Sequence, residues 1–431
     1  MGDAIGEAGI RPKQYDRFVQ LQKKATPDEL IELTNHPSSV VRCYAFWALS
    51  EMPSVNLIPI IVNHIHDTTS VETLFGCIGG TEKVGDFFIR FIMAPYGDLK
   101  FKKLTKAEFE YLDSLLVYTP NDLDAKIDAI LFQKPTEAFY ARARELVIQD
   151  GNPFALSILA SYQKAQDVSL ILNYQTLYDP NDGFFYTCKA IQKFPHPAFF
   201  PLLRQHVQNM TSKKGFYSEY SVLYKAIARY KNDSACILLQ TPFTAIQDKD
   251  AQKDHAEWVL EAVQAYYAPV YEPLLWQMWE QYHRINPRFY RLLCKKNPEK
   301  ALAATVQTFQ NTGEVSTELL NVMLDTLLKY DRPLAIALIN KNIRDIGVLQ
   351  FSVFADKVLE IKDSSFVTSL FDRLEKEHNA HVYLKVTRVL IAFKDNDINR
   401  RIVAVSKTNP HLRKGWGGKD FSKLLKEKGI E

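Results

Sequence analysis

The sequence has few of the residues from which disulfide-rich or metal-binding proteins are built. It contains five cysteines, all far apart and none in a Cys-x-x-Cys pair: Cys43, Cys77, Cys188, Cys236 and Cys294. An odd number of scattered cysteines excludes a disulfide framework, and no spacing among them fits a zinc site. We therefore interpret them as small buried hydrophobic residues, and we predict no metal and no cofactor.

Long apolar runs are also missing. A membrane-spanning helix needs about 18 apolar residues, and the nearest run, residues 57–65, is interrupted by Pro59, Asn63 and His64. The first residues, MGDAIGEAGIRPKQ, lack the basic and apolar regions of a signal peptide. These observations predict a cytoplasmic protein with no membrane partner.

The charge balance is close to neutral. Lys and Arg number 53 and Asp and Glu number 50, so the formal charge of +3 is too small to predict a polyanionic partner. Hydrophobic residues make up 46% of the chain, which is typical of a folded globular protein. Because 431 residues exceed the size of one compact core, we expect two domains or one extended repeat array.

The C-terminal segment carries most of the positive charge. Residues 400–431 contain nine Lys or Arg and three Asp or Glu, a local charge of +6 that leaves −3 for residues 1–399. Residues 415–418 (Gly-Trp-Gly-Gly) suggest a flexible hinge, and residues 419–428 place Phe421, Leu424 and Leu425 on one helix face. We interpret this segment as the polar cap of a repeat array, with a phosphate-binding basic arm as the alternative.

An internal repeat dominates the rest of the sequence. Three segments align without gaps at a spacing of 36 residues, and two further copies fit the same template: residues 189–203, 225–239 and 261–275, then 47–61 and 325–339. Each segment has an apolar stripe at helical spacing, a short polar or proline-containing turn, and a second apolar stripe. Each segment is therefore predicted to form a helix, a turn and a second helix.

Such helix pairs bury their apolar stripes only by stacking on one another, which predicts an all-α superhelix of antiparallel pairs, an α-solenoid. Ala190, Ala226 and Ala262 mark a position of close helix approach, and Leu202, Leu238 and Leu274 mark a buried position. We expect N-terminal repeats over residues 1–95, a continuing array over 96–410 and a basic cap over 411–431. The glycine-containing region 76–118 fits the template least well, and we interpret it as an irregular repeat.

Residues 36–49 (HPSSVVRCYAFWAL), followed by Pro59 and Asp67, resemble a HEAT repeat, an armadillo-type helical repeat. The resemblance is clearest over residues 28–78, and it implies that Arg42 and Asp67 stabilise the turns between repeats. His36 stands where the family usually has Asp. A tetratricopeptide array is the competing interpretation, but its Trp-Leu-Gly-Tyr signature is missing.

Aromatic residues concentrate between positions 258 and 290, and exposed Trp and Tyr often anchor partners on repeat proteins. The candidate binding residues are Trp258, Tyr267, Tyr271, Trp276 and Tyr282. Trp279 is expected in the core, and core packing is the favoured interpretation for most of the cluster.

Catalytic patterns are weak. His64 and His66 diverge if they lie on a helix, so we expect exposed histidines at a helix end and no metal site. The glycines between 76 and 85 do not match the P-loop motif that binds phosphates, and the Gly-x-Ser-x-Gly motif of serine hydrolases is absent. We predict no catalytic residue.

The leading hypothesis is therefore a non-catalytic scaffold that presents a curved surface to another protein or a peptide. Some HEAT-fold proteins are DNA glycosylases that grip DNA on a basic face, and the −3 charge of residues 1–399 argues against that alternative. A second alternative is a HEAT-like protein that holds a small molecule or chromophore against the aromatic cluster. The sequence does not indicate the oligomeric state.

Overall fold

The protein is described here from a computed structural model, which describes residues 5, 9–75, 77–93, 104–177, 183–210, 217–309 and 315–430. About 75% of the chain is helical, with 26 α-helices and one two-stranded sheet among the described residues. The predicted all-α class is therefore confirmed.

The chain divides into two compact units, Met1–Gln205 and His206–Glu431. The predicted boundary between residues 95 and 96 lies outside the described residues. The elements up to this division are α1 (Lys13–Lys24), α2 (Pro27–Leu33), α3 (Ser39–Ser50), α4 (Ile58–Asn63), β1 (Ser70–Phe75), β2 (Ile78–Lys83), α5 (Val84–Met93), α6 (Lys106–Tyr118), α7 (Ala125–Leu131), α8 (Glu137–Asp150), α9 (Pro153–Ser161), the 3-10 turn η1 (Ala165–Asp167), α10 (Val168–Leu177), α11 (Gly183–Lys193), the 3-10 turn η2 (Pro197–Phe199) and α12 (Phe200–Met210), which contains the division.

The second unit continues with helices only among its described residues. They are α13 (Tyr217–Ala228), α14 (Asp233–Ala245), α15 (Lys249–Ala265), the 3-10 turn η3 (Pro269–Tyr271), α16 (Glu272–Tyr282), α17 (Pro287–Lys296), α18 (Pro298–Thr308), α19 (Thr317–Tyr330), α20 (Arg332–Ile343), α21 (Val348–Ile361), α22 (Phe366–Lys376), α23 (Ala380–Ile391), α24 (Asn396–Thr408), α25 (His411–Lys414) and α26 (Gly418–Glu427).

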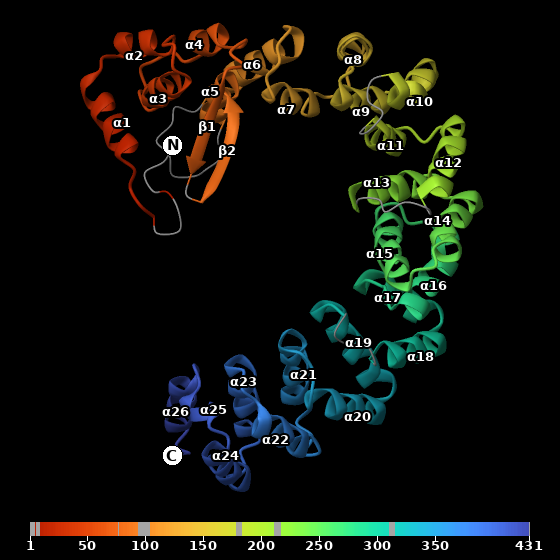
Figure 1. Ribbon diagram of the computed structural model, residues 1–431. Helices are drawn as coiled ribbons and strands as arrows, with labels where there is room; N and C mark the ends of the chain where they lie inside the picture. The colour runs from red at the N-terminus through yellow and green to blue at the C-terminus, as the bar shows by residue number, and fades with distance from the viewer. Residues whose placement is uncertain are drawn as a thin grey trace. The chain divides into compact units, whose positions relative to one another are not determined.

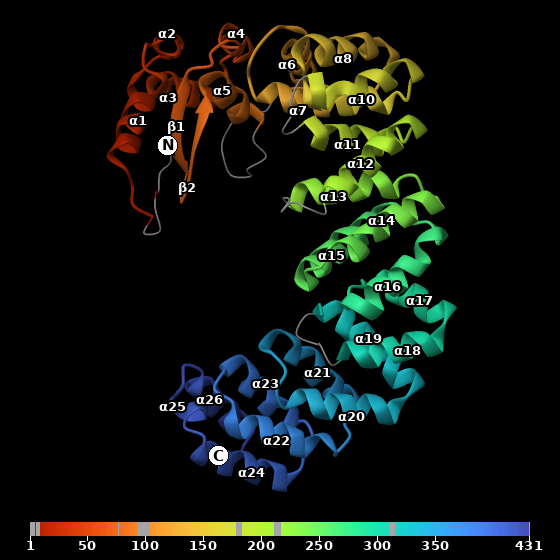
Figure 2. The ribbon, with the colours of Figure 1, turned by 45° about the vertical axis from the view of Figure 1, so that its right-hand side comes forward.

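Within each unit, helices pack on their neighbours in sequence and on the helix two places further along (Figures 1 and 2). In the first unit α3, α5, α7, α9 and α11 contact one another in that order. In the second unit α17, α19, α21 and α23 do the same, and α20, α22 and α24 form a parallel series. Alternate helices therefore occupy two layers, and the buried side chains lie between them.

Side chains from one helix pair hold the C-terminal end of an earlier pair. The last four carbonyls of a helix have no partner inside it, so they need donors from elsewhere. Arg142 of α8 donates to the Val117 carbonyl at the end of α6, from Nε at 3.0 Å and from Nη2 at 2.9 Å. The Tyr174 hydroxyl of α10 donates to the carbonyl of Gly151, the residue that ends α8, at 2.5 Å. Successive pairs are thus joined by polar bonds as well as by apolar packing.

The local predictions for helices hold. Each of the five template segments spans the end of one helix and the beginning of the next, as α11 and α12 do over residues 189–203. Thr26 and Thr105 form capping boxes at the beginnings of α2 and α6, and Asn152 and Asn297 cap α9 and α18 with their side-chain oxygens. These signals depend only on neighbouring residues, which is why the sequence carries them.

The glycine-containing region differs from the prediction. In place of an irregular helical repeat, residues 70–83 form the antiparallel hairpin of β1 and β2, with Val71 opposite Glu82 and Leu74 opposite Gly79. Gly85 lies at the beginning of α5, where an added Cβ would come within 2.7 Å of the His64 carbonyl oxygen. That glycine serves close packing, whereas Gly79 and Gly80 belong to an exposed strand.

The repeat positions agree with the prediction except at one leucine. Ala190, Ala226 and Ala262 are fully buried, and Leu238 and Leu274 are buried. Leu202 is only half-buried, and its neighbour Leu203 is fully buried instead. The buried face of η2 and α12 consists of Phe199, Leu203 and Val207, which are four residues apart and therefore lie on one side of the helix. Leu202 lies beside this narrow face.

Candidate functional site

Four of the five predicted binding residues lie on α15, η3 and α16, which pack together, and Tyr267 lies in the loop between α15 and η3. Trp258 and Tyr267 are half-buried, whereas Tyr271, Trp276 and Tyr282 are buried. The structure therefore brings the cluster together but turns three of its five members away from solvent.

Tyr271 connects two helix pairs. Its hydroxyl donates to the Ala228 carbonyl at 2.8 Å and accepts a hydrogen bond from the Lys231 backbone N–H at 3.0 Å. Ala228 is the last residue of α13, and Lys231 has a positive φ of 54° in the turn that follows. Burial raises the pKa of Tyr271 to about 12, so the hydroxyl keeps its proton and can donate. This geometry gives Tyr271 a structural role.

Tyr282 and Trp279 have similar roles. The Tyr282 hydroxyl donates to Oε1 of buried Gln252 at 3.3 Å, and the Gln252 amide in turn donates to the Ile246 carbonyl at 2.6 Å. Trp279 is fully buried, as predicted, and its indole N–H donates to the Thr308 hydroxyl at 2.9 Å. These side chains bind the ends of neighbouring helices together.

Trp258 stacks on Tyr220 of α13, with ring centroids 4.9 Å apart and planes 7° apart. The ring of His255 meets both of them edge-on, and its Nδ1 is 2.7 Å from the Tyr224 hydroxyl. Burial lowers the pKa of His255 to about 4, so this histidine is neutral near pH 7. The cluster is an apolar junction between α13 and α15.

A surface pocket of about 630 Å³ lies beside Trp276, between α16 and α18. The Lys300 ammonium sits 4.3 Å from the centre of the Trp276 ring and 3.1 Å from the Glu280 carboxylate. Lys296 is likewise paired with Glu272 on the pocket's edge. The charges that face this pocket are therefore already matched within the protein.

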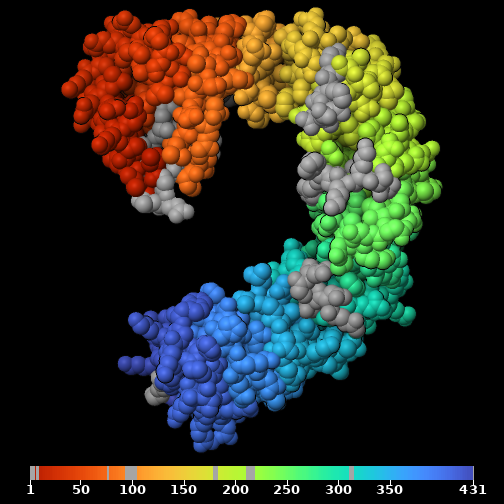
Figure 3. Space-filling model, in the orientation of Figure 1, coloured from red at the N-terminus to blue at the C-terminus, as the bar shows by residue number. Residues whose placement is uncertain are grey.

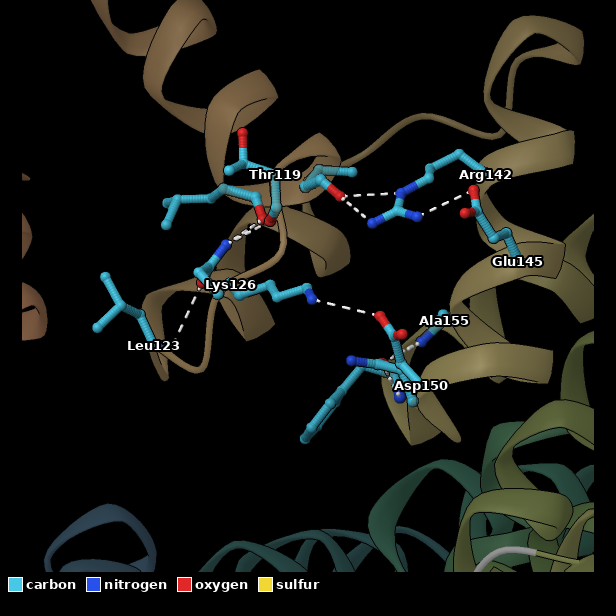
Figure 4. A network of polar contacts seen from close by, with 12 residues as sticks. Thr119, Leu123, Lys126, Arg142, Glu145, Asp150 and Ala155 are labelled. Carbon is cyan, nitrogen blue, oxygen red and sulfur yellow. Dashed lines mark hydrogen bonds and ion pairs between the residues drawn. The ribbon is translucent and has the colours of Figure 1, made fainter. Parts of the chain in front are cut away.

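A polar network joins α6, α7, α8 and α9 in the first unit (Figure 4). Asn121 donates to the carbonyls of Leu116 and Thr119 at 2.8 Å each and thereby fixes the loop before α7. Lys126 is buried, and its ammonium lies 3.4 Å from the Asp150 carboxylate at the end of α8. These residues line a pocket of about 430 Å³ whose acidic and basic groups face each other. We interpret the network as a joint between helix pairs.

The pair that the HEAT resemblance implies is in contact. Arg42 Nε lies 3.0 Å from Asp67 Oδ2, and Arg42 Nη1 donates to the carbonyls of His36 at 2.8 Å and Pro37 at 3.2 Å. Burial raises the pKa of Asp67, but the hydrogen bonds from Thr69 and the charge of Arg42 outweigh it, and the pKa is lowered overall. Arg42 therefore ties the turn before α3 to the turn after α4.

His64 differs from the prediction of exposed histidines. It is buried beside the Phe88 ring, with Nδ1 3.3 Å from Asp67, while His66 is exposed. Burial lowers the pKa of His64 despite its acidic neighbour. The two imidazoles diverge, as predicted. Among the described residues, no group of three or more His, Cys, Asp or Glu side chains is placed to hold a metal ion.

The cysteines are partly as predicted. Cys43, Cys188 and Cys236 are buried, but Cys294 is half-buried and Cys77 is exposed in the turn between β1 and β2. Burial raises the pKa of the thiols of Cys43, Cys188, Cys236 and Cys294, which disfavours the thiolate form.

No helix of the described chain has the length and apolar character to cross a membrane.

The most exposed tryptophan among the described residues is not one of the predicted binding residues. Trp416 is 69% exposed, on the loop between α25 and α26. This loop differs from the predicted flexible hinge, because Gly417 is buried against the side chains of Ala380 and Tyr383 and Gly418 is buried against the backbone of Arg413. The signal in the sequence is a tryptophan enclosed by glycines in a basic segment.

Comparisons of the chain with protein-family models, with curated proteins and with solved structures find no match.

Proposed function

We propose that the protein is a non-catalytic helical-repeat scaffold of the HEAT-like, armadillo-type class, in which each unit stacks antiparallel helix pairs as an α-solenoid. The scaffold presents its surface to another protein or to a peptide. The observation that carries the proposal is the contact of alternate helices within each unit, together with the bonds between successive pairs at Val117, Gly151 and Ala228.

Repeat arrays of this kind contact only their neighbours along the chain, so they leave long side faces available for partners. The resemblance of residues 28–78 to a HEAT repeat supports the same class, and the Arg42–Asp67 contact agrees with it. The buried aromatic cluster argues that the abundant Tyr and Trp residues serve this stacking. Its half-buried members, Trp258 and Tyr267, stay candidates for partner contacts.

The experiment is affinity capture with the full-length chain, followed by reconstitution of each captured protein with the purified chain and cross-linking to map the contact. We expect at least one partner that binds directly and cross-links to surface residues of the repeats. The tag alone serves as the control. A catalytic activity in a broad substrate screen, with no directly binding partner, would contradict the proposal.

A titration with labelled duplex DNA tests the nucleic-acid alternative. We expect weak binding that disappears near 150 mM salt, because the first 399 residues carry a net charge of −3. Tight binding at that salt concentration would favour the alternative instead.

A further inference from the structure

Trp416 lies on a loop whose backbone is hydrogen-bonded and closely packed. Gly415 donates its backbone N–H to the His411 carbonyl at 3.1 Å, and Gly418 donates to the Gly415 carbonyl at 2.9 Å. An added Cβ on Gly417 would lie 2.4 Å from Ala380 Cβ and 2.6 Å from the Tyr383 hydroxyl. The loop is therefore packed tightly against α23.

The glycines on both sides of Trp416 show the same close packing. A Cβ on Gly415 would lie 2.5 Å from the His411 carbonyl oxygen, and one on Gly418 would lie 2.2 Å from the Arg413 carbonyl oxygen. Contacts below 3 Å to backbone atoms cannot be relieved by moving a flexible side chain. The backbone on both sides of Trp416 is thus closely packed, while the indole itself is exposed and meets the His381 ring edge-on, 5.1 Å away.

The surroundings of Trp416 are basic. Lys414 and Lys419 are exposed on either side of the loop, and neither forms an ion pair with a described residue. His378, His381 and His411 are also exposed nearby, with the rings of His378 and His411 6.1 Å apart.

The carboxylates on the same elements are mostly engaged. Glu377 is buried and paired with Arg373 at 2.5 Å, and Glu427 is 3.9 Å from Lys423. Asp420 is the exposed carboxylate next to the loop. The end of the second unit, dark blue in Figure 3, therefore combines an exposed indole with unpaired positive charge.

We propose that Trp416, Lys414 and Lys419 form a docking surface for an acidic peptide segment of a partner protein. The partner's apolar side chain covers the indole, and its carboxylates meet the two lysines. This inference depends on the proposed scaffold function and names the partner's chemistry. Interfaces of this type use a tryptophan anchor inside a ring of charged contacts, and a closely packed loop loses little backbone entropy on binding.

A peptide fits this surface better than a nucleic acid does. Binding of single strands uses several aromatic side chains in a row, on which successive bases stack. Trp416 is the one large aromatic residue of α25, α26 and their loop that is more than half exposed among the described residues.

The test measures binding of a fluorescein-labelled 12-residue peptide of alternating Glu and Leu to the full-length protein by fluorescence anisotropy. A peptide of alternating Lys and Leu and a dT12 oligonucleotide are the comparison probes. We expect the acidic peptide to bind, with an affinity that falls as salt rises from 50 to 300 mM. We expect Trp416→Ala to weaken binding at least about tenfold.

Further variants separate the anchor from the charges. The pair Lys414→Glu and Lys419→Glu should also weaken binding about tenfold or more and should reduce its salt dependence. The matched controls are Tyr330→Ala, which removes another exposed aromatic ring of the second unit, and Lys341→Glu, which reverses another exposed lysine. Both controls should bind as the wild type does.

Acrylamide quenching gives an independent readout on the same samples. Trp47, Trp276 and Trp279 are buried, so Trp416 should supply most of the readily quenched fluorescence, and the acidic peptide should protect it. Circular dichroism verifies that each variant is folded.

Equal binding by the wild type and Trp416→Ala, or absence of peptide binding, would overturn the inference. Tight dT12 binding lost in Trp416→Ala would replace the peptide with a single-stranded nucleic acid. If Trp416→Ala still binds every direct partner of the wild-type chain, the result contradicts the docking surface but agrees with the scaffold proposal. If the wild-type chain has no direct partner, the result contradicts the scaffold proposal itself.

Discussion

The hydroxyl of Tyr271 is the sharpest test of whether the aromatic residues hold the repeats together. Replacing Tyr271 by Phe keeps the buried ring but leaves the Ala228 carbonyl and the Lys231 backbone N–H without their partner. Each buried polar group that loses its hydrogen bond costs about 1–3 kcal/mol. The Lys231 bond is only partly buried, so we expect the free energy of unfolding to fall by about 2–4 kcal/mol in total.

The assay is urea denaturation followed by circular dichroism, combined with hydrogen exchange. Because repeats contact only their neighbours, the loss of protection should be largest at the end of α13 and in α14. Tyr267→Phe is the matched control: this tyrosine is half-buried, its ring packs on Phe289 5.3 Å away, and its hydroxyl makes no hydrogen bond to a described residue. It should change the stability by less than about 0.5 kcal/mol. Equal stability of the two variants would refute the structural role of Tyr271.

Three further predictions follow from other buried groups. Burial lowers the pKa of His255 to about 4, so the stability that this neutral histidine contributes above its ordinary pKa of 6.5 is lost as the pH falls towards 4, by about 2–3 kcal/mol. This loss should be smaller in His255→Gln, and an equal fall of the urea midpoint between pH 7.5 and 4.5 in the wild type and the variant would contradict this. Arg42→Ala should lower the free energy of unfolding by about 3–5 kcal/mol, because it leaves the mostly buried Asp67 carboxylate without its partner. A decrease below about 1 kcal/mol in urea denaturation would show that the ion pair is dispensable. Leu238→Ala should cost about 2–5 kcal/mol through the cavity it leaves, with hydrogen exchange increased in α13 to α15; an unchanged exchange pattern would contradict its burial. Lys225→Ala, the control, should change the stability by no more than about 0.5 kcal/mol, because its ion pair with Glu261 is about one-third exposed and screened by solvent.

Helices and their ends were predictable because their signals are local. Thr26 with Glu29 and Asn152 before Pro153 each specify a helix start within four residues, and the structure has both. Ala190 and Ala226 were predictable for a related reason, since a small residue on the apolar stripe permits close helix approach. Neither prediction depends on which helix packs against the apolar stripe.

The hairpin and the single misplaced leucine depend on contacts that local patterns do not contain. Val71 is buried while Glu72 opposite Thr81 is exposed, but this alternation is short and the glycines of β2 remove the usual strand signal. Leu202 and Leu203 are adjacent and equally apolar, so only the direction from which α12 is covered decides that Leu203 is the buried one.

The aromatic cluster shows why a local concentration of aromatic residues does not by itself distinguish a binding surface from a core. A tyrosine just before or within a helix can reach back to the end of an earlier helix, and both Tyr174 and Tyr271 donate to a carbonyl there. That contact requires burial, so selection for stacking produces the same aromatic enrichment as selection for a binding surface. Trp416 is the opposite case, because the glycines beside it are closely packed while its own indole is exposed to solvent. A region with many aromatic residues can therefore be mostly core, whereas the proposed docking surface uses a single exposed tryptophan outside that region.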